Sequence, residues 1–468
     1  MINATDTMAK KKPLFSKIKD NMTPARVILL GFLGIITVGM LLLMLPISSK
    51  SGKCIGFVNS LFMATSAVCV TGLAVVDPAT QLTIFGQVVL LLLIQVGGLG
   101  FMTTTTLMFL LIGKKISLRE RLAIQENLSQ DNLKGVVKLT KRVLIFTFVV
   151  EGIGALILLF KFVPMMGFGR GLYVSVFTAI SAFCNAGLDI LGMDFGAYSS
   201  LAGIYSSPIP MLTIAGLIIV GGLGFMVFAD IYGRKKNRRL ALHTKVAIGM
   251  TAALLAIGTI FFFAAEYYNP LTLGKMSFGD KLVNAFFQST TARTAGFSSV
   301  NQGDLTEGSK LITIMLMFVG ASPASTGGGI KTTTLFVMIM VLIATLRDAD
   351  EVVVGKQTIT RKTTRKVVTI IMVASALVLL QTTLLWLVEG GDDDSALLSY
   401  IFESVSAFAT VGLSTGITPT LHIVSKISLC ATMFIGRVGV LTLGMAIMQK
   451  ARKDNVKIKY PDAKILIG

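Results

Sequence analysis

Apolar residues occur along the chain in long runs that polar or basic segments separate. Eight runs have 20 residues or more, and each of four shorter runs, of 15 to 17 residues, lies between two long ones. A membrane-spanning helix needs about 20 apolar residues, so the long runs predict full crossings and the short runs predict re-entrant segments. The long runs are 27–46, 84–112, 143–163, 211–232, 246–265, 311–345, 367–388 and 423–448, and the short runs are 57–71, 172–186, 279–295 and 396–411.

Basic residues gather in five blocks between these groups of runs. The blocks hold 32 of the 43 Lys and Arg residues, at 10–26, 114–142, 234–245, 347–366 and 450–464. Because Lys and Arg are enriched in cytoplasmic loops, this alternation predicts that both termini are cytoplasmic and that the number of crossings is even. The first run follows a basic N-terminus with no small-residue cleavage site, so we expect it to be a retained span.

The composition agrees with a multi-pass protein of the plasma membrane. Of the 468 residues, 53% are hydrophobic and 14% are charged, and the mean hydropathy is +0.77. A soluble domain would carry about 25% charged residues. The net charge of +19 follows the membrane topology, so we do not expect nucleic acid as a partner. The cysteines and the two histidines, His243 and His422, show no metal-ligand spacing or nucleophile–base pair, so we expect neither an enzyme nor an organic cofactor.

The four short runs end in the same pattern. Each has a hydroxyl residue, five further residues, a glycine and an apolar residue, with the glycines at Gly72, Gly187, Gly296 and Gly412. A second glycine motif follows in the next long run, at 96–101, 220–225, 319–323 and 435–440. Two motifs that recur in order at a period above 100 residues indicate duplication of a whole unit.

The predicted fold is therefore an all-α polytopic membrane protein. It has four parallel helix–pore loop–helix repeats around a central pore with pseudo-fourfold symmetry, which gives eight full spans and four re-entrant pore helices. The predicted division is an N-terminal segment 1–26, repeats 27–112, 113–232, 233–346 and 347–449, and a cytoplasmic tail 450–468.

The four loops predict a binding site for a monovalent cation. Non-helical backbone at membrane depth must line a cavity or lie buried in protein, so the loops are expected to face one another. Glycine adopts positive φ without steric cost, which lets neighbouring carbonyls turn toward one axis and replace the hydration shell of a cation. No ring of carboxylates, Arg or Lys recurs there, which favours K⁺ over divalent cations or anions. The predicted filter residues are Val70, Thr71, Gly72, Asn185, Ala186, Gly187, Thr294, Ala295, Gly296, Thr410, Val411 and Gly412. The alternative is that these glycines only pack helices closely.

Two features below the filter predict a gate. The second helix of the third repeat contains Pro323 and three consecutive glycines, which cannot continue an ordinary helix. Arg437 stands where the other repeats have Gly98, Gly222 and Ala321, and an intramembrane Arg is expected to face the pore. The predicted gate residues are Gly320, Ala321, Ser322, Pro323, Thr326, Gly327, Gly328, Gly329, Lys331 and Arg437. A merely kinked packing helix is the alternative.

Several other charged residues lie near this pathway. Arg293, in the third loop, is expected to bind backbone carbonyls or Glu403 and to hold the filter rigid. Glu151 is either a buried contact between helices or a proton-coupling group. An acidic outer mouth would attract cations, and its candidates are Asp189, Asp194, Glu389, Asp392, Asp393 and Asp394.

With these motifs in place, the chain resembles the Ktr/Trk/HKT superfamily of potassium transporters, most of all its bacterial Ktr membrane subunit. The resemblance covers about 27–468 and rests on the four glycine loops, the broken helix at 320–333 and Arg437. It implies a filter at the four glycines, an intramembrane gating loop and an Arg barrier. It also implies a homodimer in the lipid membrane, with one pore per protomer, on a cytoplasmic ring of nucleotide-binding regulatory subunits of the RCK type.

The transport mechanism stays open between two classes. K⁺ uptake through a channel-like filter, with sodium stimulation as an open point, is the first. An alternating-access symporter coupled to Na⁺ or H⁺ is the second, and such folds often carry inverted repeats and broken helices. The parallel orientation of the repeats and the lack of a repeated acidic site favour the first class.

Overall fold

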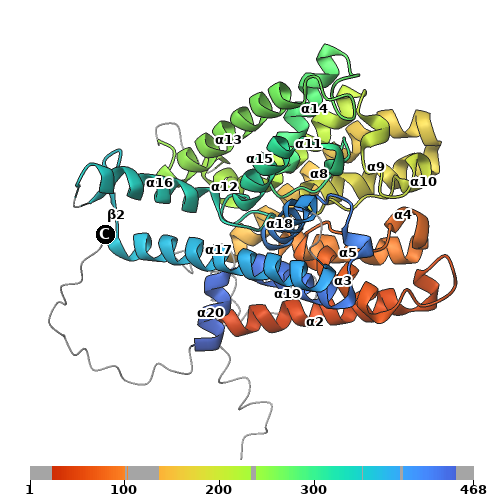
Figure 1. Ribbon diagram of the computed structural model, residues 1–468, viewed down its shortest axis with the longest axis horizontal. Helices are drawn as coiled ribbons and strands as arrows, with labels where there is room; N and C mark the ends of the chain where they lie inside the picture. Colours follow the sequence, from red (N-terminus) through yellow and green to blue (C-terminus); the bar gives the residue numbers. More distant parts are fainter. Residues whose placement is uncertain are drawn as a thin grey trace, which may run out of the picture.

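The computed structural model describes residues 24–100, 103, 136–232, 239–349, 351–390 and 394–448. Most of the basic blocks at 10–26 and 114–142 lies outside the described residues. The same holds for the tail 450–468 and for Asp392 and Asp393. The described part is almost entirely helical (Figure 1).

Four long helices form the outer part of the molecule: α2 (Pro24–Met44), α8 (Val136–Met166), α13 (Leu242–Glu266) and α17 (Arg361–Glu389). Among the described residues these four are long and apolar enough to cross a membrane. Each exposes large apolar side chains over most of its length, for example Phe160 (82% exposed) on α8 and Ile260 (70% exposed) on α13. Helices with this surface need an apolar solvent, as the runs of the sequence predicted.

A short and deeply buried helix follows each long one. These helices are α3 (Phe57–Cys69), α9 (Phe168–Phe183), α14 (Phe278–Thr291) and α18 (Asp394–Ala409). Their bounds agree with the four short apolar runs to within a few residues. Their C-terminal halves are buried, and α3 is fully buried from Phe62 to Cys69. Figure 1 shows α18 in the middle of the molecule. Their inner ends carry Ser and Thr rather than Leu, which fits a polar centre.

The third helix is broken in the second, third and fourth groups, and in the first group the residues just after Gly100 lie outside the described part of the chain. In the third group α15 (Glu307–Phe318) and α16 (Thr332–Leu346) flank a non-helical segment, as predicted. The second group was predicted as one run, 211–232, but α11 (Pro208–Leu223) and α12 (Phe225–Tyr232) meet at an angle of 85°. The fourth run likewise divides into α19 (Ile423–Val438) and α20 (Val440–Met448), and α5 (Ile84–Leu99) ends at Gly100.

The helices end or bend at these glycines for a local reason. Gly100, Gly224 and Gly439 have φ of +81°, +91° and +89°, a conformation outside the helical region that glycine adopts without strain. Among the described residues, four helices can span a membrane, or five if α11 and α12 count as one span.

Short elements complete the described chain. Between the long helices lie α4 (Pro78–Gln81), α10 (Gly192–Phe195), and the 3-10 turns η1 (Pro46–Ser48), η2 (Ala202–Ile204), η3 (Gln302–Asp304) and η4 (Thr418–Thr420). An antiparallel hairpin of β1 (Val352–Val354) and β2 (Gln357–Ile359) joins α16 to α17.

Candidate ion pathway

The four predicted filter loops share one backbone conformation. The residue two positions before each glycine has positive φ: Val70 (+55°), Asn185 (+59°), Thr294 (+69°) and Thr410 (+51°). Each glycine has positive φ as well, whereas the residue between them does not. Positive φ in a β-branched residue is rare and strained, so its recurrence in three loops indicates a functional constraint.

This alternation of φ sign decides where the carbonyl groups point. In an ordinary strand successive carbonyls point to opposite sides, whereas alternating the sign of φ turns them to the same side. None of the hydrogen bonds within the described residues uses the backbone carbonyl oxygens of 70–72, 185–187, 294–296 or 410–412 as an acceptor. Buried carbonyls without partners are uncommon in proteins, so the carbonyl oxygens of these four loops are available as ligands for a cation.

The N–H groups of the same loops are, in contrast, tied back to the pore helices. Thr71, Ala186 and Val411 donate to the carbonyls of Ser66 (2.8 Å), Ser181 (2.8 Å) and Ser406 (2.9 Å). The hydroxyls of this serine set also hold the loops: Gly72 N–H donates to Ser66 Oγ, Gly412 N–H donates to Ser406 Oγ, and Ser181 Oγ donates to the Leu188 carbonyl.

The third loop replaces this serine by a neighbouring residue. Ala295 N–H and the Thr291 hydroxyl make the equivalent contacts, to the Thr291 and Phe297 carbonyls. The recurring hydroxyl of the sequence motif therefore has a structural role in three loops, which the spacing alone did not reveal.

The four glycines lie in a closed ring. A methyl group added at Gly72 would lie 2.6 Å from the carbonyl oxygen of Ala186, and one at Gly187 would lie 2.5 Å from that of Ala295. A methyl group at Gly296 would meet the Val411 carbonyl oxygen, and one at Gly412 would meet the Thr71 carbonyl oxygen. Each glycine thus faces the carbonyl just before the glycine of the next loop, in the order 1, 2, 3, 4 and back to 1. The close approach leaves no room for a side chain at any of the four positions.

The segment between α15 and α16 lies directly against two of these loops. We call residues 320–331 the intramembrane loop. A methyl group at Gly327 would meet the Thr294 hydroxyl, and one at Gly328 would meet the Thr410 hydroxyl. Thr294 and Thr410 carry the strained φ angles described above. The predicted gate segment is therefore in contact with the predicted filter.

Hydrogen bonds attach the intramembrane loop to the second repeat. Its Ser322 N–H donates to the Gly222 carbonyl (3.0 Å), and its Ala324 carbonyl accepts from the Phe225 N–H (2.8 Å) at the break between α11 and α12. The Thr326 hydroxyl donates to the carbonyl of Phe183 at the end of α9 (3.1 Å). The loop is thus a defined structure rather than a simple kink.

Two cationic side chains hold the same loop. Lys331 Nζ donates to the carbonyls of Gly327 (2.7 Å) and Gly328 (3.3 Å). Arg437 donates to the Thr326 carbonyl and, on its other side, to the carbonyl of Gly97 in α5. Arg437 lines the inner cavity and links the intramembrane loop to α5, a contact that the sequence did not predict.

Cavities lie on both sides of this arrangement. We name them outer and inner after the membrane orientation proposed below. The outer cavity has a volume of about 460 Å³ and includes all four ring glycines in its lining. The inner one, of about 360 Å³, is lined by the intramembrane loop, Lys331 and Arg437. The ring and the loop together separate the two cavities.

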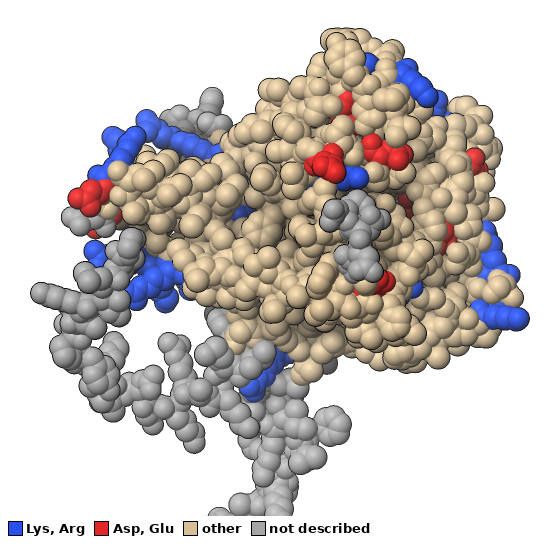
Figure 2. Space-filling view, viewed as in Figure 1, with Lys and Arg blue, Asp and Glu red and all other residues tan. Residues whose placement is uncertain are grey.

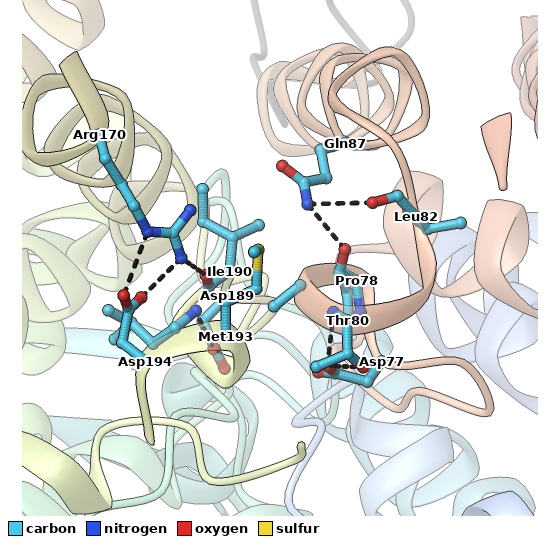
Figure 3. Close-up of polar contacts among 12 residues, drawn as sticks. Asp77, Pro78, Thr80, Leu82, Gln87, Arg170, Asp189, Ile190, Met193 and Asp194 are labelled. Carbon is cyan, nitrogen blue, oxygen red and sulfur yellow. Dashed lines mark hydrogen bonds and ion pairs between the residues drawn. The ribbon is translucent and has the colours of Figure 1, made fainter. Parts of the chain in front are cut away.

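The outer cavity is acidic. Asp77 and Asp189 line it, and no Lys or Arg is among its described lining residues. Figure 3 shows that the nearby Arg170 is instead paired with Asp194, at 2.6 Å, and that Asp77 accepts from Thr80. Burial raises the pKa of Asp189 to about 6, against the hydrogen bond from the Leu191 N–H. Asp77 was not among the predicted residues of the outer mouth, because it lies farther along the sequence from the first loop than Asp189 lies from the second.

The remaining charged candidates are placed as follows. Arg293 approaches the carbonyls of Thr251 and Gly320, each at 3.5 Å. Within the described residues, no hydrogen bond or ion pair joins Glu403 to Arg293. The Glu403 carboxylate accepts from the Ser414 hydroxyl and from the backbone N–H of Thr415, just after the fourth loop.

Two of the acidic candidates accept hydrogen bonds from residues outside the four loops. The Glu151 carboxylate accepts from Gln95 of α5, at 3.1 Å. Glu389 accepts from the N–H of His422 and does not line the outer cavity.

Known proteins resemble this chain over nearly its whole length. Residues 7–457 match the family model described as TrkH, cation transport protein, so the chain belongs to this family of cation transport proteins. It is 41% identical to the Ktr system potassium uptake protein B of Bacillus subtilis, covering 95% of this chain and 97% of that protein. It is 37% identical to the potassium/sodium uptake protein NtpJ of Enterococcus hirae, covering 97% and 99%.

A solved structure shares the fold. The crystal structure of the potassium transporter TrkH from Vibrio parahaemolyticus superposes with a TM-score of 0.71 at 15% identity, covering 93% of this chain and 87% of that one. The resemblance of the sequence to the Ktr/Trk superfamily is thereby confirmed, and the family consists of transport proteins rather than enzymes.

Proposed function

We propose that the protein takes up potassium ions across the plasma membrane through the ring of four loops. The observation that carries this proposal is the closed ring of loops whose backbone carbonyls accept no hydrogen bond within the described residues. Such oxygens can replace the hydration shell of a weakly hydrated monovalent cation. The relatives from Bacillus subtilis and Vibrio alginolyticus, 41% and 40% identical, are both named potassium uptake proteins.

The proposed architecture is four parallel repeats, 27–112, 113–232, 233–346 and 347–449, with eight crossings and both termini in the cytoplasm. The recurring order of a long helix, a buried helix, a loop and a broken helix supports it. In this arrangement the broken third helices complete the remaining crossings. The acidic cavity beside the ring then faces the exterior and raises the local concentration of cations.

The intramembrane loop is the proposed gate. It lies against the third and fourth loops, and Lys331 and Arg437 hold it there from the inner side. Positive charge in the inner cavity opposes the passage of a cation, so displacement of Arg437 and of the loop would open the path. The proposed partners are a second copy of the chain and a cytoplasmic nucleotide-binding ring.

A link to sodium is the second candidate property. It rests on the relative from Enterococcus hirae, which is named a potassium/sodium uptake protein. Coupled transport requires rubidium uptake that rises with a sodium gradient, whereas regulation requires only the presence of sodium.

The proposal is tested by growth rescue and rubidium uptake in a bacterium that lacks potassium uptake. Wild type and Gly72→Asp are compared with Gly52→Asp, because Gly52 also has positive φ but has nothing within 4 Å of an added methyl group. We expect uptake by wild type and Gly52→Asp and loss in Gly72→Asp at equal expression. Uptake by Gly72→Asp at the wild-type rate would remove this loop from the pathway. If wild type takes up no rubidium even with a co-expressed regulatory subunit, the substrate is another ion.

A further inference from the structure

The beginning of α17 carries an unusual concentration of positive charge. Its first six residues include Arg361, Lys362, Arg365 and Lys366, all exposed. Arg361 lies one turn from Arg365, and Lys362 one turn from Lys366, so like charges are stacked along the helix, which is unfavourable. The positive end of the helix dipole also lies here, and it disfavours cations. A bound anion would therefore stabilise the beginning of α17 by reducing this repulsion.

No protein group supplies that anion in the described chain. None of the four side chains forms an ion pair with an Asp or Glu of the described residues. The nearest acidic side chain in an adjoining cavity is Glu351, which accepts a hydrogen bond from Thr358. Figure 2 shows Lys and Arg atoms gathered at the end of the molecule where α17 begins.

The four side chains line one side of a shallow, open cavity. It has a volume of about 500 Å³, and its other lining residues are Thr369 of α17 and Leu441 of α20. Figure 1 shows α20 running across the direction of α17, and the lining of the cavity is basic on the α17 side and apolar at Leu441 of α20. A phosphate group with an attached hydrocarbon chain matches this combination.

The position of the cavity along α17 indicates the source of the phosphate. A helix of 29 residues is about 43 Å long, whereas the hydrocarbon core of a bilayer is about 30 Å thick. The apolar part begins at Val367, and lipid-facing side chains follow it, such as Met372 (67% exposed) and Leu380 (68% exposed). The basic turns therefore lie at the level of the headgroups, directly beside the acyl chains.

We propose that this cavity, which we call the α17 basic cavity, binds the phosphate headgroup of an anionic phospholipid. The proposal rests on the membrane orientation given above, with the beginning of α17 on the cytoplasmic side. Basic pockets at that surface attract anionic lipids by about 1 kcal/mol for each Lys or Arg. Anionic lipid then stabilises the contact between α17 and α20, and α20 follows Arg437 of the proposed gate by only a few residues.

The test compares the full-length wild type with a variant in which Arg361, Lys362, Arg365 and Lys366 are all changed to Gln. The matched control changes Lys53, Lys161, Lys275 and Lys310 to Gln, which removes the same charge. Lys53 and Lys275 follow α2 and α13, Lys161 lies near the end of α8, and Lys310 lies in the first turn of α15. Native mass spectrometry counts the lipids retained after titration with phosphatidylglycerol or with phosphatidylcholine of the same chain length. Thermal unfolding checks that the variants are folded.

We expect wild type and the control to retain phosphatidylglycerol at a concentration about tenfold lower than phosphatidylcholine, and the cavity variant to lose this preference. Equal retention by the cavity variant, or equal loss in the control, would overturn the proposal. So would displacement of the lipid by excess inorganic phosphate, because the site would then bind free phosphate. A cavity variant that keeps its lipid but loses uptake in cells would assign the surface to a protein partner instead.

Rubidium uptake into vesicles separates this proposal from the proposed function. If no variant moves rubidium but the lipid preference follows the cavity residues, the function is wrong and the lipid site stands. If uptake occurs but the lipid preference does not follow these residues, the proposed function stands and the lipid site is wrong.

Discussion

Replacing Gly412 by Ala tests whether the close approach of the loops determines ion selectivity. The added methyl group would lie 2.2 Å from the Thr71 carbonyl oxygen, and a contact below 3.0 Å does not occur in real structures. The two loops must therefore separate by about 0.8 Å, the difference between these distances. Both groups belong to backbones that the pore helices hold, so no flexible side chain can relieve the contact. A ring that is wider at one carbonyl fits K⁺ less closely.

Gly416→Ala is the matched control for this variant. Gly416 has φ of +100°, close to the +92° of Gly412, but an added methyl group there has nothing within 4 Å. Both variants carry the strain of an L-residue at positive φ, about 1–2 kcal/mol. Only Gly412→Ala disturbs the ring.

The assay is rubidium uptake in competition with sodium, in cells with equal amounts of each variant. We expect Gly412→Ala to reduce discrimination against sodium at least about tenfold, which corresponds to about 1.4 kcal/mol. Gly416→Ala should stay within about twofold of wild type. Wild-type selectivity in Gly412→Ala would refute the reasoning, and so would an equal loss in both variants, because strain alone would then explain it.

Three further predictions concern the loop support, the gate and the outer mouth. Ser406→Ala leaves the buried Gly412 N–H without its acceptor, a loss of about 1–3 kcal/mol, and should lower selectivity in the same assay. Ser404→Ala should not, because the Ser404 hydroxyl has no hydrogen-bond partner among the described residues. Arg437→Gln removes charged hydrogen bonds to the intramembrane loop, worth about 1.5–3 kcal/mol, so rubidium flux into vesicles should rise about tenfold; unchanged flux would contradict the gate. Uptake should fall as external pH falls through about 6, where Asp189 becomes protonated and the mouth loses negative charge, and Asp189→Asn should have low uptake with a flatter pH profile.

The filter candidates could be predicted from the sequence because their requirement is local. A glycine at positive φ is needed wherever the chain turns sharply, and four such glycines in one repeated context pointed to one site. The buried helices could be predicted from the lengths of the apolar runs. Both signals depend on neighbours in the sequence.

Other parts of the site depend on residues far apart in the sequence. Arg437 binds the Gly97 carbonyl, 340 positions earlier, and no local pattern indicates that pair. The breaks at Gly224 and Gly439 were missed because a single glycine in an apolar run is compatible with a helix as well as with a break. The sequence also left open whether Arg293 binds backbone carbonyls or Glu403, because the two residues belong to different repeats and their distance in space depends on how the repeats pack.

Diffraction from crystals grown with rubidium tests the central claim most directly, because rubidium scatters anomalously and replaces potassium in carbonyl sites. We predict anomalous density on the axis of the ring formed by Gly72, Gly187, Gly296 and Gly412, within coordination distance of carbonyls from all four loops. Ordered loops with no density on this axis, together with density at another site in the membrane region, would contradict the account.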